Sequence, residues 1–246
     1  VSTDPDYPFK YVDTNSSRAE IVAISQKLEG HKIGIVGLGG TGSYVLDFVA
    51  KTPVREIHLF DGDGFSVHNA FRAPGAASVG QLNAHLKKVT YLRDIYSDMH
   101  RHIVPHEFCV DASNLEILAG MSFVFLCIDS GAAKKPIVEK LVGVGIPFCD
   151  VGIGVQSLDN ALTGSVRVTT CTATKCDHIK DRITYLAAGE DEYAQNIQIA
   201  ELNALNAILA VMKWKKLVGF YHDLEKEHHA VYETNTNKVI TDDAGS

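Results

Sequence analysis

The feature that most constrains the fold is a glycine-rich turn between a short apolar segment and an amphipathic one. Residues 33–36 (IGIV) have the composition of a buried strand, and the helical pattern that follows the glycines ends before a proline. Gly37, Gly39 and Gly42 stand at the G-x-G-x-x-G spacing, at which a strand turns tightly into a helix whose first amides face a phosphate. Residues 33–63 are therefore predicted to form a strand, a glycine turn, a helix and a second strand that together hold a nucleotide.

An acidic residue stands where a nucleotide-binding turn of this kind requires one. Asp61 ends the second predicted strand nineteen residues after Gly42, where its carboxylate can accept hydrogen bonds from ribose hydroxyls. Glycines that serve only a tight turn need no such partner. These residues alone fit an NAD-dependent oxidoreductase as well as an ATP-binding protein.

The residues beyond this aspartate favour a triphosphate over a dinucleotide. The segment DGDGFSVHNAFRAPG places Asp63, Asn69 and Arg72 in one loop, and a hydride-transfer site has no need for them. A guanidinium fork and a side-chain amide suit the extra charge of a triphosphate. Farther along, Lys87 and Lys88 begin a predicted helix face, and either lysine could face the site. Asp129 ends the apolar strand FVFLCID at the sheet edge where ligands bind in open α/β folds.

Helical and strand patterns alternate along the rest of the chain. This alternation predicts an α/β fold: a Rossmann-like, mostly parallel central sheet with helices on both faces, continued by antiparallel strands toward the C-terminus. The long helix near the C-terminus is expected to pack an apolar face into the core through Ile199, Leu202, Leu205, Leu209 and Met212. We expect helices at 18–28, 41–52, 86–99, 112–119, 134–144 and 196–217, strands at 33–36, 56–63, 102–110, 123–129, 146–154 and 162–170, and a hairpin within 231–240.

Composition and charge exclude some classes of function. No apolar run approaches the roughly 20 residues that span a bilayer, so no membrane segment is expected. The net charge is −7 with both signs interspersed, and a protein without a basic stripe is a poor partner for nucleic acid. The five cysteines are an odd number in a chain without a secretory leader, which favours reduced thiols and a cytoplasmic location. A valine at position 1 suggests a trimmed chain, which leaves open whether a further domain precedes it.

With these residues in view, the chain resembles the ThiF/MoeB/HesA-type adenylyltransferases of the ubiquitin-activating enzyme superfamily. The glycine turn of that family, GxGGxG, is matched by residues 37–42, and its D-x-D and N-x-x-R motifs are matched by Asp61, Asp63, Asn69 and Arg72. The resemblance is strong over residues 18–129 and looser to residue 170. It implies an ATP-dependent enzyme that adenylates the C-terminal glycine carboxylate of a ubiquitin-like or sulfur-carrier protein and releases pyrophosphate.

The resemblance also implies roles for individual residues. Asp61 would hold the ribose, Asn69 and Arg72 the phosphates, Lys88 the phosphate oxygens, and Asp129 a magnesium ion, although the family usually has Asp-Asn where this chain has Asp129-Ser130. Arg18 falls where the family carries an arginine that reaches into the active site of the partner in a dimer. The implied nucleotide site consists of Gly37, Gly39, Gly40, Gly42, Asp61, Asp63, Asn69, Arg72 and Lys88, and the implied catalytic residues are Arg18, Arg72, Lys88 and Asp129.

The cysteines raise two further questions. Many family members bind structural zinc through paired CxxC motifs, and Cys171-x4-Cys176 followed by His178 matches them poorly, so no zinc is expected. Some relatives pass the activated carboxylate to their own thiol. Cys171 and Cys176 lie in a polar loop near basic residues that favour thiolate, which makes them candidates; the alternative is that they are ordinary loop thiols. Cys109, Cys127 and Cys149 lie in apolar strands and are expected to be packing residues.

We expect one ThiF-type adenylation domain over residues 1–246. An N-terminal arm and helix (1–30) would precede a nucleotide-binding half (31–150) and a carrier-binding half (151–246), the latter crossed by a loop at about 171–195. The family is commonly homodimeric, and its partner is a carrier protein with a C-terminal glycine. Two alternatives remain open: an NAD-dependent oxidoreductase, and a non-catalytic nucleotide-binding scaffold of the same fold.

Overall fold

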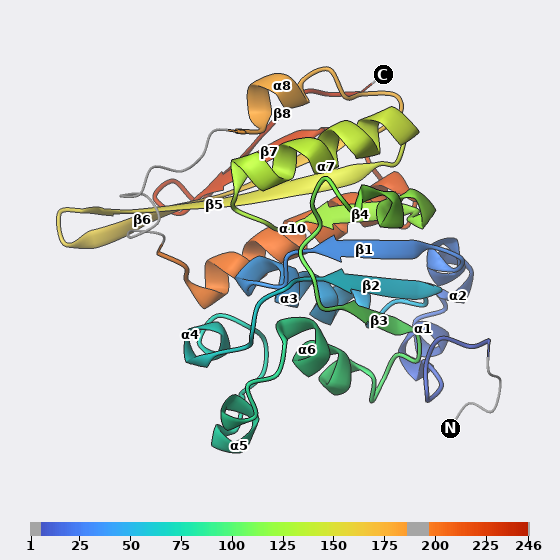
Figure 1. The fold of residues 1–246 in the computed structure, drawn as a ribbon. Helices are drawn as coiled ribbons and strands as arrows, with labels where there is room; N and C mark the ends of the chain where they lie inside the picture. The colour runs from blue at the N-terminus through green and yellow to red at the C-terminus, as the bar shows by residue number, and fades with distance from the viewer. Residues whose placement is uncertain (1–5, 186–196, 246) are drawn as a thin grey trace.

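The computed structural model of the chain describes residues 6–185 and 197–245, which form a single mixed sheet with helices on both faces (Figure 1). The sheet has the strand order β3-β2-β1-β4-β5-β6-β7-β8. Its strands are β1 (Lys32–Val36), β2 (Glu56–Phe60), β3 (Ile103–His106), β4 (Phe123–Leu126), β5 (Phe148–Leu158), β6 (Ala161–Cys171), β7 (His229–Glu233) and β8 (Lys238–Asp242).

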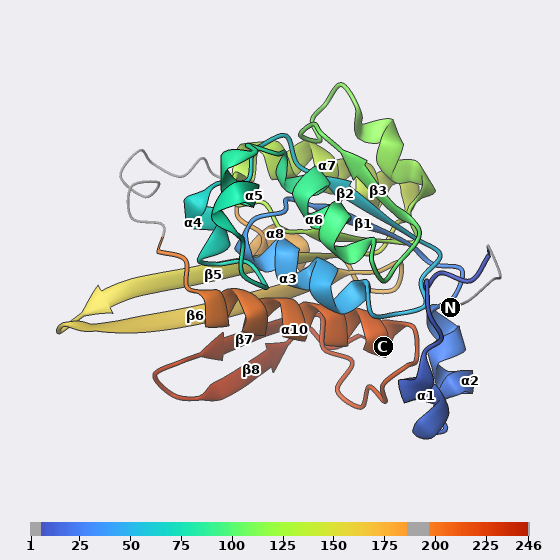
Figure 2. The same ribbon diagram turned by 90° about the horizontal axis from the view of Figure 1, so that it is seen from below.

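The strand pairing in the sheet changes from parallel to antiparallel at β5, as predicted. Strands β1 to β5 pair in parallel, and β5 to β8 pair antiparallel. The first half places β4 beside β1, so the strand order reverses there, and the carboxyl ends of β1 and β4 open a crevice at this switch point. The long β5–β6 hairpin projects beyond the body of the molecule (Figures 1 and 2).

Helices cover the two faces of the sheet. On one face lie α3 (Gly40–Val49), α6 (Lys88–Tyr96) and α10 (Ala200–Leu217), and on the other lie α7 (Gly131–Val144) and the 3-10 helix η2 (Leu115–Gly120) (Figure 2). Adjacent residues of β4 illustrate how one strand serves both cores, because Phe125 packs with α10 while Leu126 packs with α7. Shorter helices are α1 (Thr14–Arg18), α2 (Val22–Ser25), η1 (Gln26–Leu28), α4 (Val67–Ala70), α5 (Val79–Asn83) and α8 (Ile179–Arg182).

Several predicted boundaries are wrong for identifiable reasons. The single helix predicted over 18–28 is three short helices, because Glu20 adopts a left-handed backbone conformation with φ of 57°. The helix predicted over 86–99 begins only at Lys88, and α5 precedes it. Strands β5 and β6 are longer than expected because they pair with each other without interruption up to the turn at Asp159 and Asn160.

The N-terminal arm packs against the body of the molecule through Phe9, which is buried against His100, whereas Tyr11 is exposed. The loop predicted at 171–195 contains α8 and the end of β6, and its residues 186–195 lie outside the described part of the chain. The predicted C-terminal hairpin is confirmed as β7 and β8. Among the helices that the structure describes, none combines the length and the apolar character needed to cross a bilayer.

Candidate functional site

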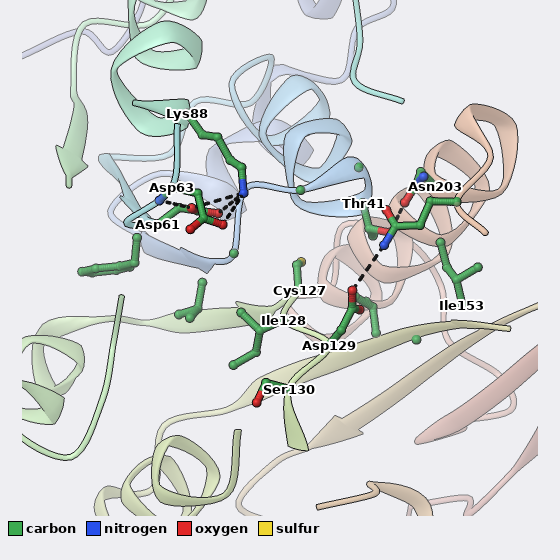
Figure 3. A pocket seen from close by; sticks show the side chains of 18 of the residues that line it. Thr41, Asp61, Asp63, Lys88, Cys127, Ile128, Asp129, Ser130, Ile153 and Asn203 are labelled. Atoms are coloured by element: carbon green, nitrogen blue, oxygen red, sulfur yellow. Dashed lines mark hydrogen bonds and ion pairs between the residues drawn. The ribbon is translucent and has the colours of Figure 1, made fainter. Parts of the chain in front are cut away.

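A cavity of about 330 Å³ lies at the carboxyl ends of β1, β2 and β4 and beside the middle of β5 (Figure 3). Its volume falls in the range of small-molecule sites. Most of the residues predicted for a nucleotide site border it, from elements far apart in the sequence: Gly37, Gly39, Gly40, Asp61, Asp63, Arg72, Lys88 and Asp129.

The glycine turn forms one wall of this cavity. Gly37 has a φ of +89°, and a Cβ there would lie 2.6 Å from the carbonyl oxygen of Cys127 on the neighbouring strand. A Cβ on Gly42 would lie 1.9 Å from the carbonyl oxygen of Gly37, so this glycine lets α3 pack against the turn. A Cβ on Gly39 would meet nothing within 4 Å. The first and third glycines of the motif are therefore required by the fold, whereas the second borders open space in the cavity.

Asp61 connects the glycine turn to the loop that follows β2. Its Oδ2 accepts a hydrogen bond from the amide of Leu38 at 2.7 Å, and its Oδ1 accepts one from the amide of Asp63 at 2.9 Å. The ammonium group of Lys88 lies 3.4 Å from both carboxylate oxygens of Asp61 and 2.8 Å from Oδ2 of Asp63. The hydrogen bond from Lys88 lowers the pKa of Asp63.

The two neighbouring lysines have different positions. Lys88 is buried at the start of α6 and lines the cavity, whereas Lys87 is exposed and donates to the carbonyl of Gly62 at 2.6 Å. The structure therefore brings Lys88, not Lys87, to the predicted nucleotide site.

Arg72 and Asn69 both lie in the segment after β2, but only one of them lines the cavity. Arg72 borders it, and its Nε is buried without a hydrogen-bond partner in the described residues. Asn69 is buried as part of the N-terminal cap of α4, where its Oδ1 accepts from the amide of Ser66 at 3.0 Å and from the hydroxyl of Ser66 at 2.8 Å. Its contact with phosphate stays a prediction, and its observed role is to hold the loop that carries Arg72.

Asp129 lies just beyond β4, across the cavity from Lys88 (Figure 3). Its Oδ2 accepts a hydrogen bond from Nε2 of Gln198 at 3.2 Å. The next residue, Ser130, caps the N-terminus of α7 by accepting from the amide of Ala133. In the described part of the chain, no three His, Cys, Asp or Glu side chains gather as a metal-binding cluster. One exposed carboxylate at this edge suits magnesium, which commonly binds through one or two carboxylates together with substrate phosphates.

The structure adds side-chain amides from α10 that sequence reasoning missed. Asn203 and Asn206 line the cavity and are 1% and 0% exposed. Asn203 accepts a hydrogen bond from the hydroxyl of Thr41 at 2.9 Å, and Asn206 donates one to the carbonyl of Gly152 at 3.0 Å. The available signal was two asparagines three residues apart in residues 202–212, a stretch of this helix that is otherwise apolar, and this spacing places both on one face.

The sequence model of the ThiF family matches residues 16–240 of this chain. The chain belongs to the ThiF family.

Curated relatives are similar over part of their length. The ubiquitin-like modifier-activating enzyme 5 of Drosophila grimshawi is 21% identical over 170 residues, which cover 65% of this chain and 42% of that protein. The adenylyltransferase and sulfurtransferase UBA4 of Saccharomyces cerevisiae (strain RM11-1a) is 26% identical over 139 residues, which cover 55% of this chain and 31% of that protein. The match therefore spans less than half the length of either relative.

Solved structures of similar fold cover nearly the whole chain. The structure of Escherichia coli MccB with MccA-N7isoASN superposes with a TM-score of 0.74 at 16% identity, covering 96% of this chain and 73% of that chain. The structure of PaaA superposes with a TM-score of 0.72 at 16% identity, covering 100% of this chain and 78% of that chain. These likenesses confirm the predicted Rossmann-like ThiF fold.

Arg18, the predicted trans-acting residue of the ThiF family, does not reach the cavity of its own chain. It is exposed at the end of α1, which lies beyond the amino ends of the strands, whereas the cavity is at their carboxyl ends (Figure 1). Its role in a partner subunit stays a prediction.

The expectation that all five cysteines are reduced is wrong in this structure, because Cys171 and Cys176 form a disulfide. Cys171 pairs with Phe148 at the amino end of β5. Gly152, which lines the cavity, is four residues farther along β5, and at the rise of a strand this separates Cys171 from the level of Gly152 by about 13 Å. The structure therefore brings neither of these sulfurs to the cavity as a free thiol. Their role as acceptors of the activated carboxylate stays a prediction.

The remaining cysteines differ in exposure. Cys149 is buried, as expected, and burial raises its pKa to about 12. Cys127 is half-buried and lines the cavity; burial raises the pKa of this thiol as well. Cys109 is exposed at the cavity, which corrects the expectation that it is a packing residue, because β3 ends three residues before it.

Proposed function

We propose that this chain is an ATP-dependent activating enzyme that adenylates the C-terminal glycine carboxylate of a ubiquitin-like or sulfur-carrier protein. The observation that carries the proposal is the arrangement around one cavity of a phosphate-type glycine turn, the cations Lys88 and Arg72, and the carboxylates Asp61 and Asp129. The names of the relatives, a modifier-activating enzyme and an adenylyltransferase, support the same class of reaction.

The residues around the cavity suit the parts of ATP. Asp61 would accept from the ribose hydroxyls, and the first amides of α3, which no side chain caps, would face the phosphates. Arg72 and Lys88 would neutralise the phosphate oxygens, so the ammonium of Lys88 would exchange part of its contact with Asp63 for the nucleotide. Asp129 would hold the magnesium ion, which when bound would offset charge on the phosphates.

The proposed reaction needs positioning more than proton transfer. The substrate carboxylate is already ionised; one of its oxygens attacks the α-phosphorus, the bond from that phosphorus to the bridging oxygen breaks, and pyrophosphate leaves with the electron pair. The products are an acyl-adenylate and pyrophosphate, so charge and atoms balance without a general base. Lys88 and Arg72 would contribute by stabilising the charge that builds on the phosphate oxygens.

We propose that the two halves of the chain bind different substrates. Residues 31–150 would bind the nucleotide and residues 151–246 the carrier, in one domain preceded by the arm of residues 1–30. We further propose a homodimer in which Arg18 completes the site of the partner, working in the cytoplasm. The exposed position of Arg18 on α1 is compatible with contact to a second subunit.

Exchange of radiolabelled pyrophosphate into ATP tests this proposal. We expect exchange that depends on a candidate carrier protein ending in Gly-Gly and on Mg²⁺, and no exchange when the terminal carboxylate of the carrier is amidated. Tight binding of NADH without binding of ATP would instead support an oxidoreductase. ATP binding with no exchange across many carriers would support a non-catalytic scaffold.

A further inference from the structure

The α10 end of the cavity carries side-chain amides whose orientation is fixed by their partners. Nδ2 of Asn206 lies 3.0 Å from the carbonyl oxygen of Gly152, and a carbonyl can only accept. The NH₂ group of Asn206 must therefore face Gly152, and the other atom of the amide is its oxygen. In the same way Nε2 of Gln198 faces a carboxylate oxygen of Asp129, which leaves the oxygen of Gln198 as the second atom.

Both of these oxygens are buried acceptors without a partner. Oδ1 of Asn206, on a side chain that is fully buried, and Oε1 of Gln198 accept no hydrogen bond from any described residue. Asn203 differs, because its oxygen accepts from Thr41 and its NH₂ donates to the carbonyl of Ile199 at 3.0 Å. Asn203 therefore positions the glycine turn, whereas Asn206 and Gln198 retain acceptor capacity beside the cavity that they line.

The cavity is thus polarised between its two ends. The end at Lys88 and Arg72 presents donors, which suits an anion; among them is Nε of Arg72, for which the described part of the chain provides no acceptor. The end at α10 presents unpartnered acceptors, which suit an N–H donor, because a buried acceptor without a partner is costly until a ligand donates to it. Asp129 lies between the two sets, hydrogen-bonded to Gln198 and facing Lys88 across the cavity (Figure 3).

Resting on the proposed adenylation, we propose that Asn206, together with Gln198, accepts the amide N–H of the last peptide bond of the substrate. This makes Asn206 a specificity-determining residue of the proposed reaction, because the final residue of a polypeptide C-terminus carries an N–H next to the reacting carboxylate group. A fatty or aromatic carboxylate has no donor at that position and would leave the Asn206 oxygen unpaired. The site would discriminate against such acids by the hydrogen bond they cannot form.

Binding of acyl-adenylate mimics tests this inference without knowledge of the carrier. The probe is 5′-O-(N-glycylglycylsulfamoyl)adenosine, and its matched analogue replaces the peptide N–H by CH₂. By calorimetry we expect the parent protein to bind the amide probe about tenfold more tightly than the methylene analogue, as for one hydrogen bond. In Asn206→Ala we expect this ratio to fall to within about twofold. A ratio that stays near tenfold in the variant, or a parent protein that does not discriminate, would overturn the inference.

Two controls separate the possible failures. Asn203→Ala disturbs Thr41 but not the proposed acceptor, so both probes should weaken while their ratio stays near tenfold. If Asn206→Ala does not fold, Asn206→Leu, which keeps the branched shape of the side chain without an acceptor, is interpreted in the same way. Sulfamoyladenosine, which has no peptide, reports on the nucleotide half alone. If the parent protein binds neither it nor ATP, the proposed function fails, whereas equal binding of the two peptide probes defeats only the assignment of Asn206.

Discussion

Lys88 and Asp61 form an ion pair in which both side chains are buried, with 9% and 8% of their surfaces exposed. Removal of one member of a buried pair is costly because it leaves the other charge uncompensated. The same lysine contacts the exposed carboxylate of Asp63 at 2.8 Å. Lys88 therefore has two roles: it stabilises the loop after β2, and it is the cation that we propose to bind phosphate.

Replacement of Lys88 by methionine should therefore affect both stability and activity. We expect Lys88→Met to lower the rate of pyrophosphate exchange by about a hundredfold or more, because a preorganised cation at the phosphates is lost. We also expect it to lower the free energy of unfolding by about 3 kcal/mol. Lys87→Met is the matched control, and it should change neither quantity appreciably, because Lys87 is exposed and donates to the carbonyl of Gly62 at the surface. Equal losses in the two variants would refute the assignment of Lys88.

The magnesium assignment predicts a specific change in Asp129→Asn. The asparagine oxygen can still accept from Gln198, so the local structure should persist while the charge is lost. We expect exchange to fall by about a hundredfold, and the Mg²⁺ concentration for half-maximal exchange to rise, because a carboxylate ligand has been removed. Asp111→Asn, at an exposed turn, is the control. If Asp129→Asn exchanged as fast as the parent protein at every Mg²⁺ concentration, Asp129 would not be the magnesium ligand.

Two alanine substitutions in the glycine turn should have opposite consequences. A Cβ at residue 39 meets no atom of the described residues within 4 Å, so Gly39→Ala should fold normally and weaken ATP binding where the methyl group enters the cavity. A Cβ at residue 42 would lie 1.9 Å from a backbone oxygen, so Gly42→Ala should lower the melting temperature by several degrees or prevent folding. Circular dichroism and ATP titration on both variants distinguish these outcomes. Unchanged ATP binding by Gly39→Ala would place the phosphates elsewhere.

The local patterns predicted much of the fold and of the nucleotide end of the site. Gly37, Asp61 and Lys88 are close in sequence to the elements that position them. Motif spacing placed Gly37 and Asp61 at one sheet edge, and the family resemblance added Lys88. The helix break at Glu20 was not predictable, because a left-handed backbone at a non-glycine residue depends on the tertiary contacts that hold it. The same applies to the disulfide, since spacing alone does not bring Cys171 and Cys176 together.

The α10 end of the site shows why the remainder could not be predicted. Helical periodicity favoured a buried face that included Leu205 and Met212, but Met212 is 41% exposed. The structure instead buries the face of Asn203, Asn206 and Trp214, because α10 packs against both α3 and β5. Which face of α10 meets the cavity depends on how this helix packs against α3 and β5. Local sequence patterns do not reveal this packing, because the contacting residues are more than 150 positions apart in the sequence.

The position of the disulfide predicts that its cysteines are dispensable for adenylation. Cys171 ends β6 beside the amino end of β5, away from the cavity, so Cys171→Ser should leave the rate of pyrophosphate exchange within about twofold of the parent protein. A separate assay with carrier protein, under reducing and non-reducing conditions, asks whether a thioester forms on either sulfur. Loss of exchange in a folded Cys171→Ser protein would show that this end of β5 does contribute to adenylation.

The last prediction concerns His100, which is buried beneath the N-terminal arm. Its Nε2 lies 3.0 Å from the carbonyl oxygen of Val54, and its Nδ1 accepts from the amide of His102 at 3.2 Å. The neutral ring with its proton on Nε2 satisfies both partners, and a proton on Nδ1 would break the second bond. Burial lowers the pKa of His100 from 6.5 to about 4.

This lowered pKa predicts acid destabilisation over a defined range. Between pH 6.5 and about 4 the unfolded chain binds a proton at this histidine while the folded protein does not, so the free energy of unfolding falls as the pH falls. The contribution that is lost approaches about 3 kcal/mol. His100→Gln does not titrate; it should be less stable than the parent at pH 7 but lose less stability on acidification, as measured by urea unfolding at several pH values. His222→Gln, at an exposed position, should follow the parent curve. Parallel curves for His100→Gln and the parent would show that His100 is not the group that links folding to pH.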